Sequence, residues 1–229
     1  MSVVAATMND GVEQAPIPHG AEGWAMANLF PMFLKLEGRR CVVVGAGAAA
    51  EQKLEGLLTA GAEVHVVAPE AGERVCALAA GGRVTWTARA FDASDLDGTF
   101  LAVAATGDPA VNEAVFRAAE TRGVLCNAVD EPERCHFYCP AVVRRGDLQI
   151  AISTGGHSPA LAQRLRAELE AAFGPEYGPW LRWLARVRAL FFRRALDPQR
   201  RRQALHRIAS REVYERFTRA HERRAGGSR

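Results

Sequence analysis

Short apolar runs alternate with stretches of helical period along residues 40–127. The first run, Arg40-Cys-Val-Val-Val44, is rich in β-branched residues and long enough for one buried strand. Gly61 stands where the helix that follows would end. We predict strands over 40–44, 63–68, 84–87, 100–105 and 124–127, and helices over 48–60, 70–80 and 110–121. This alternation indicates an open, mainly parallel sheet with helices on both faces.

The pattern changes after Pro140. Two further apolar runs are joined by Gly146-Asp147, a dipeptide typical of tight β-hairpin turns. The next helix would begin with Ser158 as its N-cap and Pro159 as its first residue. We predict strands over 141–145 and 148–153 and a helix over 159–173.

The chain beyond Tyr177 reads as helical. Pro179 and Pro198 are expected to interrupt the helix, and the terminal Gly-Gly-Ser-Arg is expected to fray. The shifts in pattern divide the chain into four parts. They are a leader over 1–28, a sheet domain over 29–139, a hairpin region over 140–174 and an Arg-rich helical domain over 175–229.

Residues 1–28 show no sustained periodicity. Two interpretations stay open: a disordered leader, or a start codon assigned too early, with Met26 as the true first residue. The segment lacks the basic start and apolar core of a secretory signal. No run in the chain approaches the roughly 18 apolar residues of a membrane-spanning helix, so we expect no membrane partner.

Charge is divided unevenly along the chain. Residues 180–229 hold 15 Arg against four acidic residues, a formal charge of +11, and the net charge of +3 therefore leaves −8 on residues 1–179. Such asymmetry suggests an anionic partner: nucleic acid, a membrane surface or a polyanionic small molecule. Against nucleic acid, apolar residues at helical spacing predict one packed stripe with Arg on a solvated face. The stripe consists of Trp180, Trp183, Leu184, Val187, Leu190 and Phe191.

Five cysteines are an odd number and too few for a disulfide scaffold. Without an export signal we interpret them as reduced thiols, which indicates a cytoplasmic protein. Cys126, Cys135, His136 and Cys139 would permit a zinc site, but the paired C-x2-C knuckles of structural zinc sites are absent. We favour small buried thiols and predict no metal site.

A G-x-G-x-x-A motif stands between the first predicted strand and its helix. Gly45 would allow the tight turn, Gly47 would let the backbone approach a pyrophosphate, and Ala50 would keep helix and strand close. The helix N-terminus adds unpaired N–H groups and a positive dipole. The motif therefore predicts a dinucleotide site.

The end of the second predicted strand offers two ways of binding the ribose. Pro69 ends the second predicted strand, and either Glu70 just beyond it or backbone groups would serve. The nearest Arg, Arg74, does not follow the strand directly. This spacing favours NAD over NADP.

Four segments occur in the same order in a known family. They are FPMFLKLEGRRCVVVGAGAAAEQK, LAVAATGDPAVN, VLCNAVDEPERCHFYCPAVV and IAISTGGHSPALAQRLRAELE. On these segments, residues 30–173 resemble the siroheme synthase N-terminal module, the precorrin-2 dehydrogenase and sirohydrochlorin ferrochelatase family. The helical tail resembles it more weakly. The C-N-x-V-D and S-T-G-G-x-S-P elements in combination are far more specific than the glycine loop.

The resemblance implies a Rossmann-type, mainly parallel α/β sheet followed by a hairpin-containing dimerisation region and a C-terminal helical domain, assembled as a homodimer. It implies NAD-dependent oxidation of precorrin-2 to sirohydrochlorin on the way to siroheme. Some members then insert Fe2+ and others do not, and the sequence leaves open that activity and the choice of Fe2+ or Co2+. Longer members carry a methyltransferase domain after the helices, so we expect that methylation to belong to another protein.

The family's catalytic aspartate falls on Asp130, just past a predicted parallel strand, where open α/β sheets place their sites. A carboxylate there could take a proton as the macrocycle loses a hydride, or take pyrrole protons during metal insertion. The alternative is a turn-forming Asp. The family's cofactor contacts carry over to Gly45, Gly47, Ala48, Ala49, Pro69 and Glu70. Ala48 and Gly107 depart from the family pattern of polar or acidic residues, which leaves a role for those side chains open.

Two further groups of residues are candidates for the site. Thr106 and Asn112 could bound the nicotinamide, although for Asn112 we favour helix capping. The resemblance implies that the glycine-rich loop borders the tetrapyrrole, and its members are Ser153, Thr154, Gly155, Gly156 and Ser158. His157 could act as an acid, a base or a transient metal ligand, or have no role. Thr154 stands where some relatives have a phosphorylated serine.

Two classes of function compete. One is the oxidoreductase, whose carboxylate-rich substrate would explain some of the excess Arg. The other is an NAD-sensing regulator with a basic helical tail for nucleic acid, which the charge division alone would permit. We favour the enzyme and expect no nucleic acid, because Asp130 and the S-T-G-G-x-S-P loop have no use in a plain sensor.

Overall fold

The computed structural model describes residues 29–193 and 197–226. The chain divides into two units, Met1–Phe30 and Pro31–Arg229, and every helix and strand of the described residues belongs to the second unit. The predicted leader over 1–28 and the last three residues lie outside the described part. The sheet domain, predicted over 29–139, lies in the second unit from Pro31 onward.

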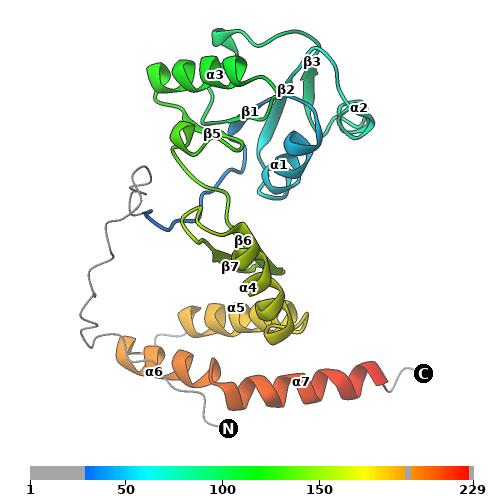
Figure 1. The fold of residues 1–229 in the computed structure, drawn as a ribbon. Coiled ribbons are helices and arrows are strands. Elements are labelled where there is room, and N and C mark those ends of the chain that lie inside the picture. The colour runs from blue at the N-terminus through cyan, green and yellow to red at the C-terminus, as the bar shows by residue number, and fades with distance from the viewer. Residues whose placement is uncertain (1–28, 194–196, 227–229) are drawn as a thin grey trace, which may run out of the picture. The chain divides into compact units, whose positions relative to one another are not determined.

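The strands of the sheet domain are β1 (Arg40–Val44), β2 (Glu63–Val67), β3 (Thr85–Thr87), β4 (Leu101–Ala104) and β5 (Leu125–Ala128). Its α-helices are α1 (Ala48–Thr59), α2 (Glu73–Ala80) and α3 (Pro109–Arg122). The strands form one parallel sheet in the order β3-β2-β1-β4-β5 (Figure 1). The predicted parallel α/β sheet is confirmed, with β1 and β4 adjacent at the point where the order of strands reverses.

The two faces of the sheet bury separate apolar clusters. In β1, Cys41 and Val43 belong to the cluster that α1 and α2 cover, whereas Val42 and Val44 belong to the cluster that α3 covers. Successive side chains of a strand point to opposite faces. A strand covered on both faces therefore reads as a continuous apolar run, which is why β1 was detectable.

The predicted boundaries differ from the structure in places. Helix α2 begins at Glu73, later than predicted, because Gly72 takes an extended conformation as its N-cap. The 3-10 helices η1 (Ala93–Leu96) and η2 (Pro132–Arg134) carry no periodicity and are absent from the prediction. Residues Asp92 and Asp95 form a capping box around η1, a signal that the sequence did contain.

The hairpin region consists of β6 (Ala141–Arg145), β7 (Leu148–Ile152) and α4 (Pro159–Ala172). The two strands pair antiparallel, as predicted. Arg145 donates hydrogen bonds to the carbonyl oxygens of Phe173 at 2.7 Å and of Glu170 at 2.9 Å. It thereby satisfies carbonyl groups at the end of α4 that have no partner within the helix.

The helical tail consists of α5 (Tyr177–Arg193), α6 (Pro198–Ile208) and α7 (Arg211–Gly226). An aromatic cluster joins α5 to α7: the ring centroid of the buried Trp180 lies 5.0 Å from that of Trp183, 5.1 Å from Phe217 and 5.7 Å from Tyr214. Among the described helices, none has the length and hydropathy that crossing a membrane requires.

The structure corrects the prediction for the tail in three places. Pro179 does not interrupt the helix but lies in the first turn of α5, where its missing N–H would have no partner anyway. Leu190 is 56% exposed, so the predicted stripe does not extend to it. The break between α6 and α7 falls at Ser210, without Gly or Pro, and only the break before Pro198 is as predicted.

Candidate functional site

Gly45 brings the ends of three strands together. It adopts φ +106°, a conformation that residues with a Cβ rarely take. Its N–H donates to the carbonyl oxygen of Val67 at 2.9 Å, and an added Cβ would lie 2.3 Å from the carbonyl oxygen of Ala105. The glycine is therefore required by the packing of the strand ends themselves.

Gly47 differs from Gly45. It is the extended N-cap of α1, with φ −84° and no side-chain capping bond, and an added Cβ would meet nothing within 4 Å. The first N–H groups of a helix have no acceptor within it. Here Ala48 is exposed and Ala49 half-buried, so the backbone at this end of α1 is accessible. These groups fit a dinucleotide pyrophosphate.

A cavity of about 390 Å³ lies beside the glycine loop. Of the predicted cofactor residues, Gly45, Pro69 and Thr106 line it, from the ends of β1, β2 and β4. Its position at the β1–β4 switch point is where open α/β sheets bind ligands. The sheet thus provides a cavity and a phosphate cradle side by side.

Other residues at the cavity depart from the prediction. Glu70 is exposed just beyond β2 and does not line the cavity. The cavity wall also includes Phe91, which is not among the predicted site residues because no local pattern distinguishes it from a core residue. Arg74 lies 3.5 Å from Glu55 in an exposed ion pair on the helical side, so it is not positioned in advance for a 2′-phosphate.

Asp130 follows β5 at the same edge of the sheet. It is exposed, and among the described residues it is the only one other than glycine with a positive φ, at +62°. Its turn is closed by the N–H of Glu131, which donates to the carbonyl oxygen of Ala128 at 3.3 Å. The Asp130 side chain makes no hydrogen bond or ion pair with the described residues and is free to meet a ligand.

Asn112 is not a helix cap, contrary to the prediction. Asp108 caps α3, with its side chain accepting from the N–H of Ala110 at 2.8 Å. Asn112 lies one turn further along, 3% exposed, and bonds to both Thr106 and Glu131. The capping interpretation failed because a helix start offers several polar residues, and only tertiary contacts decide which is the cap.

The C-N-x-V-D element holds its loop through Asn127. The side-chain amide of Asn127 donates to the carbonyl oxygen of Phe137 at 2.9 Å and to the sulfur of Cys135 at 3.2 Å. Burial raises the pKa of the Cys126 thiol to about 12, so it is protonated at neutral pH. Within the described part of the chain, no group of three or more His, Cys, Asp or Glu is placed to hold a metal ion.

The loop over 153–158 is shaped by its own hydroxyl groups. Ser158 caps α4 by accepting from the N–H of Leu161 at 3.2 Å, and Pro159 is the first helical residue, as predicted. The Thr154 hydroxyl lies 3.1 Å from the carbonyl oxygen of Ser158, and the Ser153 hydroxyl accepts from the N–H of Gly155 at 3.1 Å. His157 and Gly156 are exposed.

The hydrogen bonds of this loop are local. Within the described residues they join the loop to itself and to the start of α4, and none reaches Thr106 or Asp130. The structure thus brings Thr106 and the Asp130 turn together through Asn112. No hydrogen bond among the described residues joins the predicted tetrapyrrole loop, residues 153–158, to Thr106 or to the Asp130 turn.

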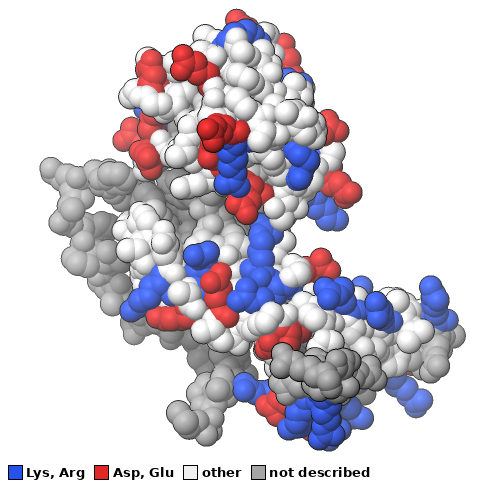
Figure 2. Space-filling model, turned by 90° about the vertical axis from the view of Figure 1, so that its right-hand side faces the viewer, with Lys and Arg blue, Asp and Glu red and all other residues white. Residues whose placement is uncertain are grey.

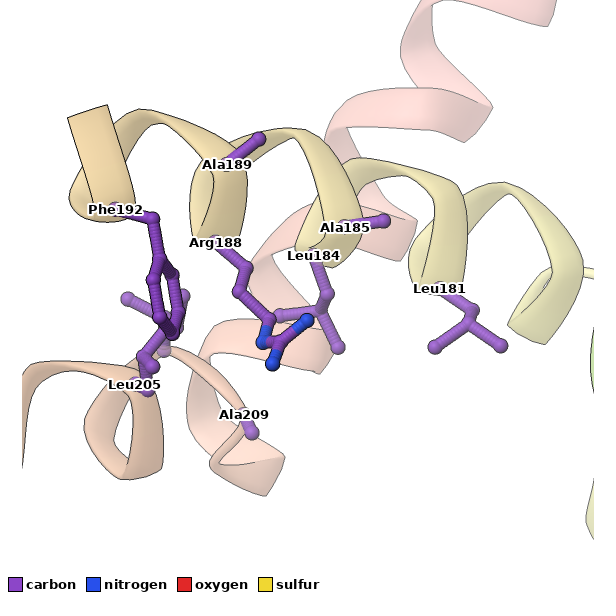
Figure 3. Close-up of a pocket in the computed structure, with 9 residues that line it drawn as sticks. Leu181, Leu184, Ala185, Arg188, Ala189, Phe192, Leu205 and Ala209 are labelled. Atoms are coloured by element: carbon purple, nitrogen blue, oxygen red, sulfur yellow. The ribbon is translucent and has the colours of Figure 1, made fainter. Parts of the chain in front are cut away.

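A larger cavity, of about 700 Å³, lies between α5 and α6 and contains none of the predicted site residues. Figure 3 shows Leu184 and Arg188 of α5 directed toward Leu205 of α6 and the C-cap residue Ala209. The guanidinium of Arg188 lies 4.9 Å from the ring centroid of Phe192, a cation–π contact. This groove is apolar except for that Arg.

The arginines of the tail differ from helix to helix. Arg211 and Arg216 of α7 form ion pairs with Glu215 and Glu212, one turn away on the same helix. Helices α5 and α6 contain no acidic residue at all. On the face drawn in Figure 2, acidic side chains gather over the sheet domain and Arg over the helices.

Two family models match most of the chain between residues 32 and 172. The model for putative NAD(P)-binding covers residues 32–141, and the model for the sirohaem biosynthesis protein central region covers residues 145–172. The first spans the sheet domain and its cavity, and the second spans the hairpin turn, β7 and α4.

Curated relatives are similar over most of this chain. A siroheme synthase of Actinobacillus pleuropneumoniae serotype 3 is 36% identical over 201 residues, which is 85% of this chain and 40% of the relative. A siroheme synthase of Neisseria meningitidis serogroup C is 43% identical over 151 residues, 66% of this chain and 31% of the relative. The chain therefore spans less than half the length of these relatives.

A solved structure described as "SirC, precorrin-2 dehydrogenase" is similar over nearly its whole length. The likeness has a TM-score of 0.70 and 29% sequence identity, and it covers 81% of this chain and 92% of the other. With the glycine loop, the C-N-x-V-D turn and the S-T-G-G-x-S-P loop all present, the chain is similar to the siroheme synthases and to this precorrin-2 dehydrogenase from the glycine loop through α4.

Proposed function

We propose that this chain oxidises precorrin-2 to sirohydrochlorin with NAD. The observation that carries the proposal is the placement of an unpaired, exposed Asp130 at the same sheet edge as the cavity at the β1–β4 switch point. The likeness to a precorrin-2 dehydrogenase over 81% of the chain supports the choice of substrate. Whole-length siroheme synthases contain more than this chain does, so the proposal concerns this step.

The chain's own residues have distinct tasks in the reaction. The glycine loop and the N-terminus of α1 would hold the pyrophosphate, through Gly45, Gly47, Ala48 and Ala49. When bound, NAD would supply the acceptor for a hydride from the macrocycle. Asp130 takes the proton that the macrocycle loses with that hydride, so the products are sirohydrochlorin, NADH and a proton that passes to solvent.

The selectivity for NAD over NADP is part of the same proposal. Pro69 and Glu70 follow β2, and the Glu70 carboxylate just outside the cavity disfavours a 2′-phosphate on the ribose. Arg74, the nearest cation in sequence, is already paired with Glu55. Titration with both nucleotides checks this: tighter binding of NADP would overturn the selectivity while leaving the oxidation intact.

The tetrapyrrole would meet the glycine-rich loop. Ser153, Thr154 and Ser158 present hydroxyl groups, and Gly155 and Gly156 present accessible backbone near the start of α4. Such donors suit the carboxylate side arms of the substrate. His157 is exposed beside them, where it could exchange a proton with the macrocycle.

A homodimer is the second part of the proposal. Within the hairpin only Val143 is fully buried, and a two-stranded hairpin is marginal without further cover. A second copy packed on the hairpin and α4 would supply that cover. Light scattering at micromolar concentration should give twice the 24.8 kDa of one chain, and a monomer mass would contradict the dimer.

Insertion of Fe2+ into sirohydrochlorin is a separate question that the relatives' name raises. Asp130, without a partner, could also take the pyrrole protons that metal insertion releases. Anaerobic incubation of sirohydrochlorin and Fe2+, with and without the protein, decides it by the rate at which siroheme absorption appears.

We expect these reactions in the cytoplasm, since the buried Cys126 and Cys41 are free thiols.

The main test is anaerobic incubation with precorrin-2 and NAD. NADH and the sirohydrochlorin spectrum should appear together in equal amounts. The competing function, an NAD-sensing regulator, would give no turnover and salt-dependent retention on DNA instead. Absence of NADH formation by the NAD-bound protein would overturn the proposed oxidation.

A further inference from the structure

One buried amide ties together the loops that follow β4 and β5. We propose that Asn112 is a positioning residue that holds Asp130 at a fixed place relative to the nucleotide cavity. The inference rests on the proposed oxidation, and it concerns a residue that neither touches the cavity nor carries the chemistry itself.

The side chain of Asn112 is used in both directions. Its Oδ1 accepts from the backbone N–H of Thr106 at 3.2 Å and lies 2.7 Å from the Thr106 hydroxyl. Its Nδ2 donates to Oε1 of Glu131 at 2.8 Å and, at the longer distance of 3.4 Å, to the carbonyl oxygen of Thr106. One side of the amide therefore holds the cavity wall, since Thr106 lines the cavity, and the other holds the residue next to Asp130.

Glu131 is anchored from a second direction. Its other carboxylate oxygen accepts a hydrogen bond from Arg134, which also pairs with Glu113 of α3. The N–H of Glu131 closes the turn onto Ala128. The carboxylate thus ties the turn to α3 twice, through Asn112 and through Arg134.

This anchoring explains how Asp130 keeps an unusual backbone conformation. A residue with a Cβ at φ +62° is strained and persists only when its surroundings over-determine it. The turn from Val129 to Glu131 is held at both ends, by β5 and by the Glu131 carboxylate. Releasing that carboxylate would allow the turn to relax and Asp130 to move.

The reaction makes the position of Asp130 matter. Hydride loss toward the cavity and proton loss to Asp130 occur on one macrocycle, so the two acceptors must be correctly spaced. Small displacements of a reacting group lower rates strongly, by up to about 100-fold for about 1 Å. Asn112 joins the wall of one acceptor's cavity to the loop of the other.

Only an amide satisfies both neighbours. Asp at position 112 would keep the acceptor for the N–H and hydroxyl of Thr106 and would lose only the longer bond to the Thr106 carbonyl oxygen. It would also turn a carboxylate toward the carboxylate of Glu131, and like charges at that distance repel. Changing Glu131 to Gln at the same time would restore the hydrogen bond with its direction reversed. This exchange of donor and acceptor gives a specific test.

The experiment compares Asn112→Asp, the double variant Asn112→Asp with Glu131→Gln, and Glu120→Gln as a control on the exposed side of α3. For Asn112→Asp we expect kcat for precorrin-2 oxidation to fall about 10- to 100-fold, with the Kd for NAD changed less than about threefold because the phosphate cradle is on β1 and α1. The double variant should return kcat to within about threefold of wild type. The control should behave as wild type.

A second readout does not depend on activity. Without NAD, the backbone amides of residues 129–135 should exchange hydrogen about tenfold faster in Asn112→Asp, and amides of β1 and β2 should be unchanged. The double variant should restore protection. If wild type does not oxidise precorrin-2 yet this exchange pattern appears, the proposed function fails while the coupling stands.

Two results would overturn the proposal. One is wild-type kcat in Asn112→Asp, and the other is a loss of kcat that the double variant does not restore. If Asn112→Asp does not fold, Glu131→Ala decides, because it removes the link at a half-buried loop position. A several-fold loss of kcat with unchanged NAD affinity supports the inference, and wild-type kcat contradicts it.

Discussion

The sheet domain and the helical tail differ in how they place polar side chains. In the sheet domain the buried polar residues Asp95, Thr99, Asn112 and Asn127 all have hydrogen-bond partners. In the described part of the tail, Trp180 is the one buried hydrophobic side chain, and no polar side chain is buried. Hydrogen bonds fix the buried polar side chains of the sheet domain, whereas the polar side chains of the tail remain accessible to solvent.

This difference indicates which region can hold reacting side chains in a fixed geometry. A buried, fully bonded polar group fixes the geometry of the loops around it, because leaving it without a partner is costly. Exposed Arg residues are not fixed in that way, and exposed ion pairs contribute little. A count of 15 Arg therefore says less about the site than one buried Asn.

The largest expected effect comes from the two glycines of the loop. Gly45→Ala should lower the free energy of unfolding by about 3 kcal/mol or more, because the new Cβ meets the Ala105 carbonyl and the backbone is strained. Gly47→Ala should leave it within about 0.5 kcal/mol, since nothing lies near its Cβ. Its Kd for NAD should rise about tenfold, because the methyl group intrudes on the phosphates.

Chemical denaturation and NAD titration of both variants check this pair. If Gly47→Ala unfolded as readily as Gly45→Ala, both glycines would be structural and the distinction would be wrong. Loss of stability in Gly45→Ala alone and loss of NAD affinity in Gly47→Ala would support it.

The next effect concerns the carboxylate of Asp130. Asp130→Asn keeps the size of the side chain but removes the base, so turnover of precorrin-2 should fall at least about 100-fold. NAD affinity should persist, because the cradle lies on a different strand. Asp97→Asn, an exposed control paired with Arg122, should keep wild-type turnover. Full activity of Asp130→Asn would make Asp130 a turn residue only.

In the tail we expect a half-buried hydrogen bond to contribute more stability than the exposed ion pairs. The Tyr214 hydroxyl donates to Glu176 at 2.6 Å, and its ring stacks on Tyr177 at 4.6 Å. Tyr214→Phe should lower the free energy of unfolding by about 1–2 kcal/mol, since it removes a hydrogen bond to a charged group. Thermal melts of the variant and wild type measure the loss.

The same bond predicts a pH dependence. Chiefly the hydrogen bond from Tyr214 lowers the pKa of Glu176 from its ordinary value of 4.5. Its stabilisation is therefore complete above that pH and is lost as the pH falls through the lower pKa of the folded state. The stability difference between wild type and Tyr214→Phe should shrink on acidification below about pH 4.5. A difference that grew instead would contradict this origin.

The smallest effect is expected from a charged pair of α7. Arg216 and Glu212 form an ion pair at 2.5 Å with both side chains more than two-thirds exposed. Arg216→Ala should change the free energy of unfolding by less than about 0.5 kcal/mol, and added salt should abolish even that. A larger loss of unfolding free energy would show that the ion pairs of the tail stabilise its fold.

Local pattern was sufficient for much of the fold. The β-branched run of β1, the Gly-Asp turn of the hairpin and Ser158 before α4 are each decided within a few residues. The position of Asp130 past β5 also follows from pattern, because the ends of parallel strands meet at one edge. The glycine loop follows from its G-x-G-x-x-A motif between a strand and a helix.

Residues far apart in sequence decided the rest. Asn112 contacts Glu131 only because β4 and β5 pair and bring α3 against the turn after β5, and nothing near Asn112 in sequence distinguishes it from a cap. Phe91 joins the cavity wall for a comparable reason. Periodicity predicts the hydrogen bonds within an element, whereas partners of a buried polar side chain depend on which elements pack together. Tertiary structure alone therefore connected the cavity to Asp130.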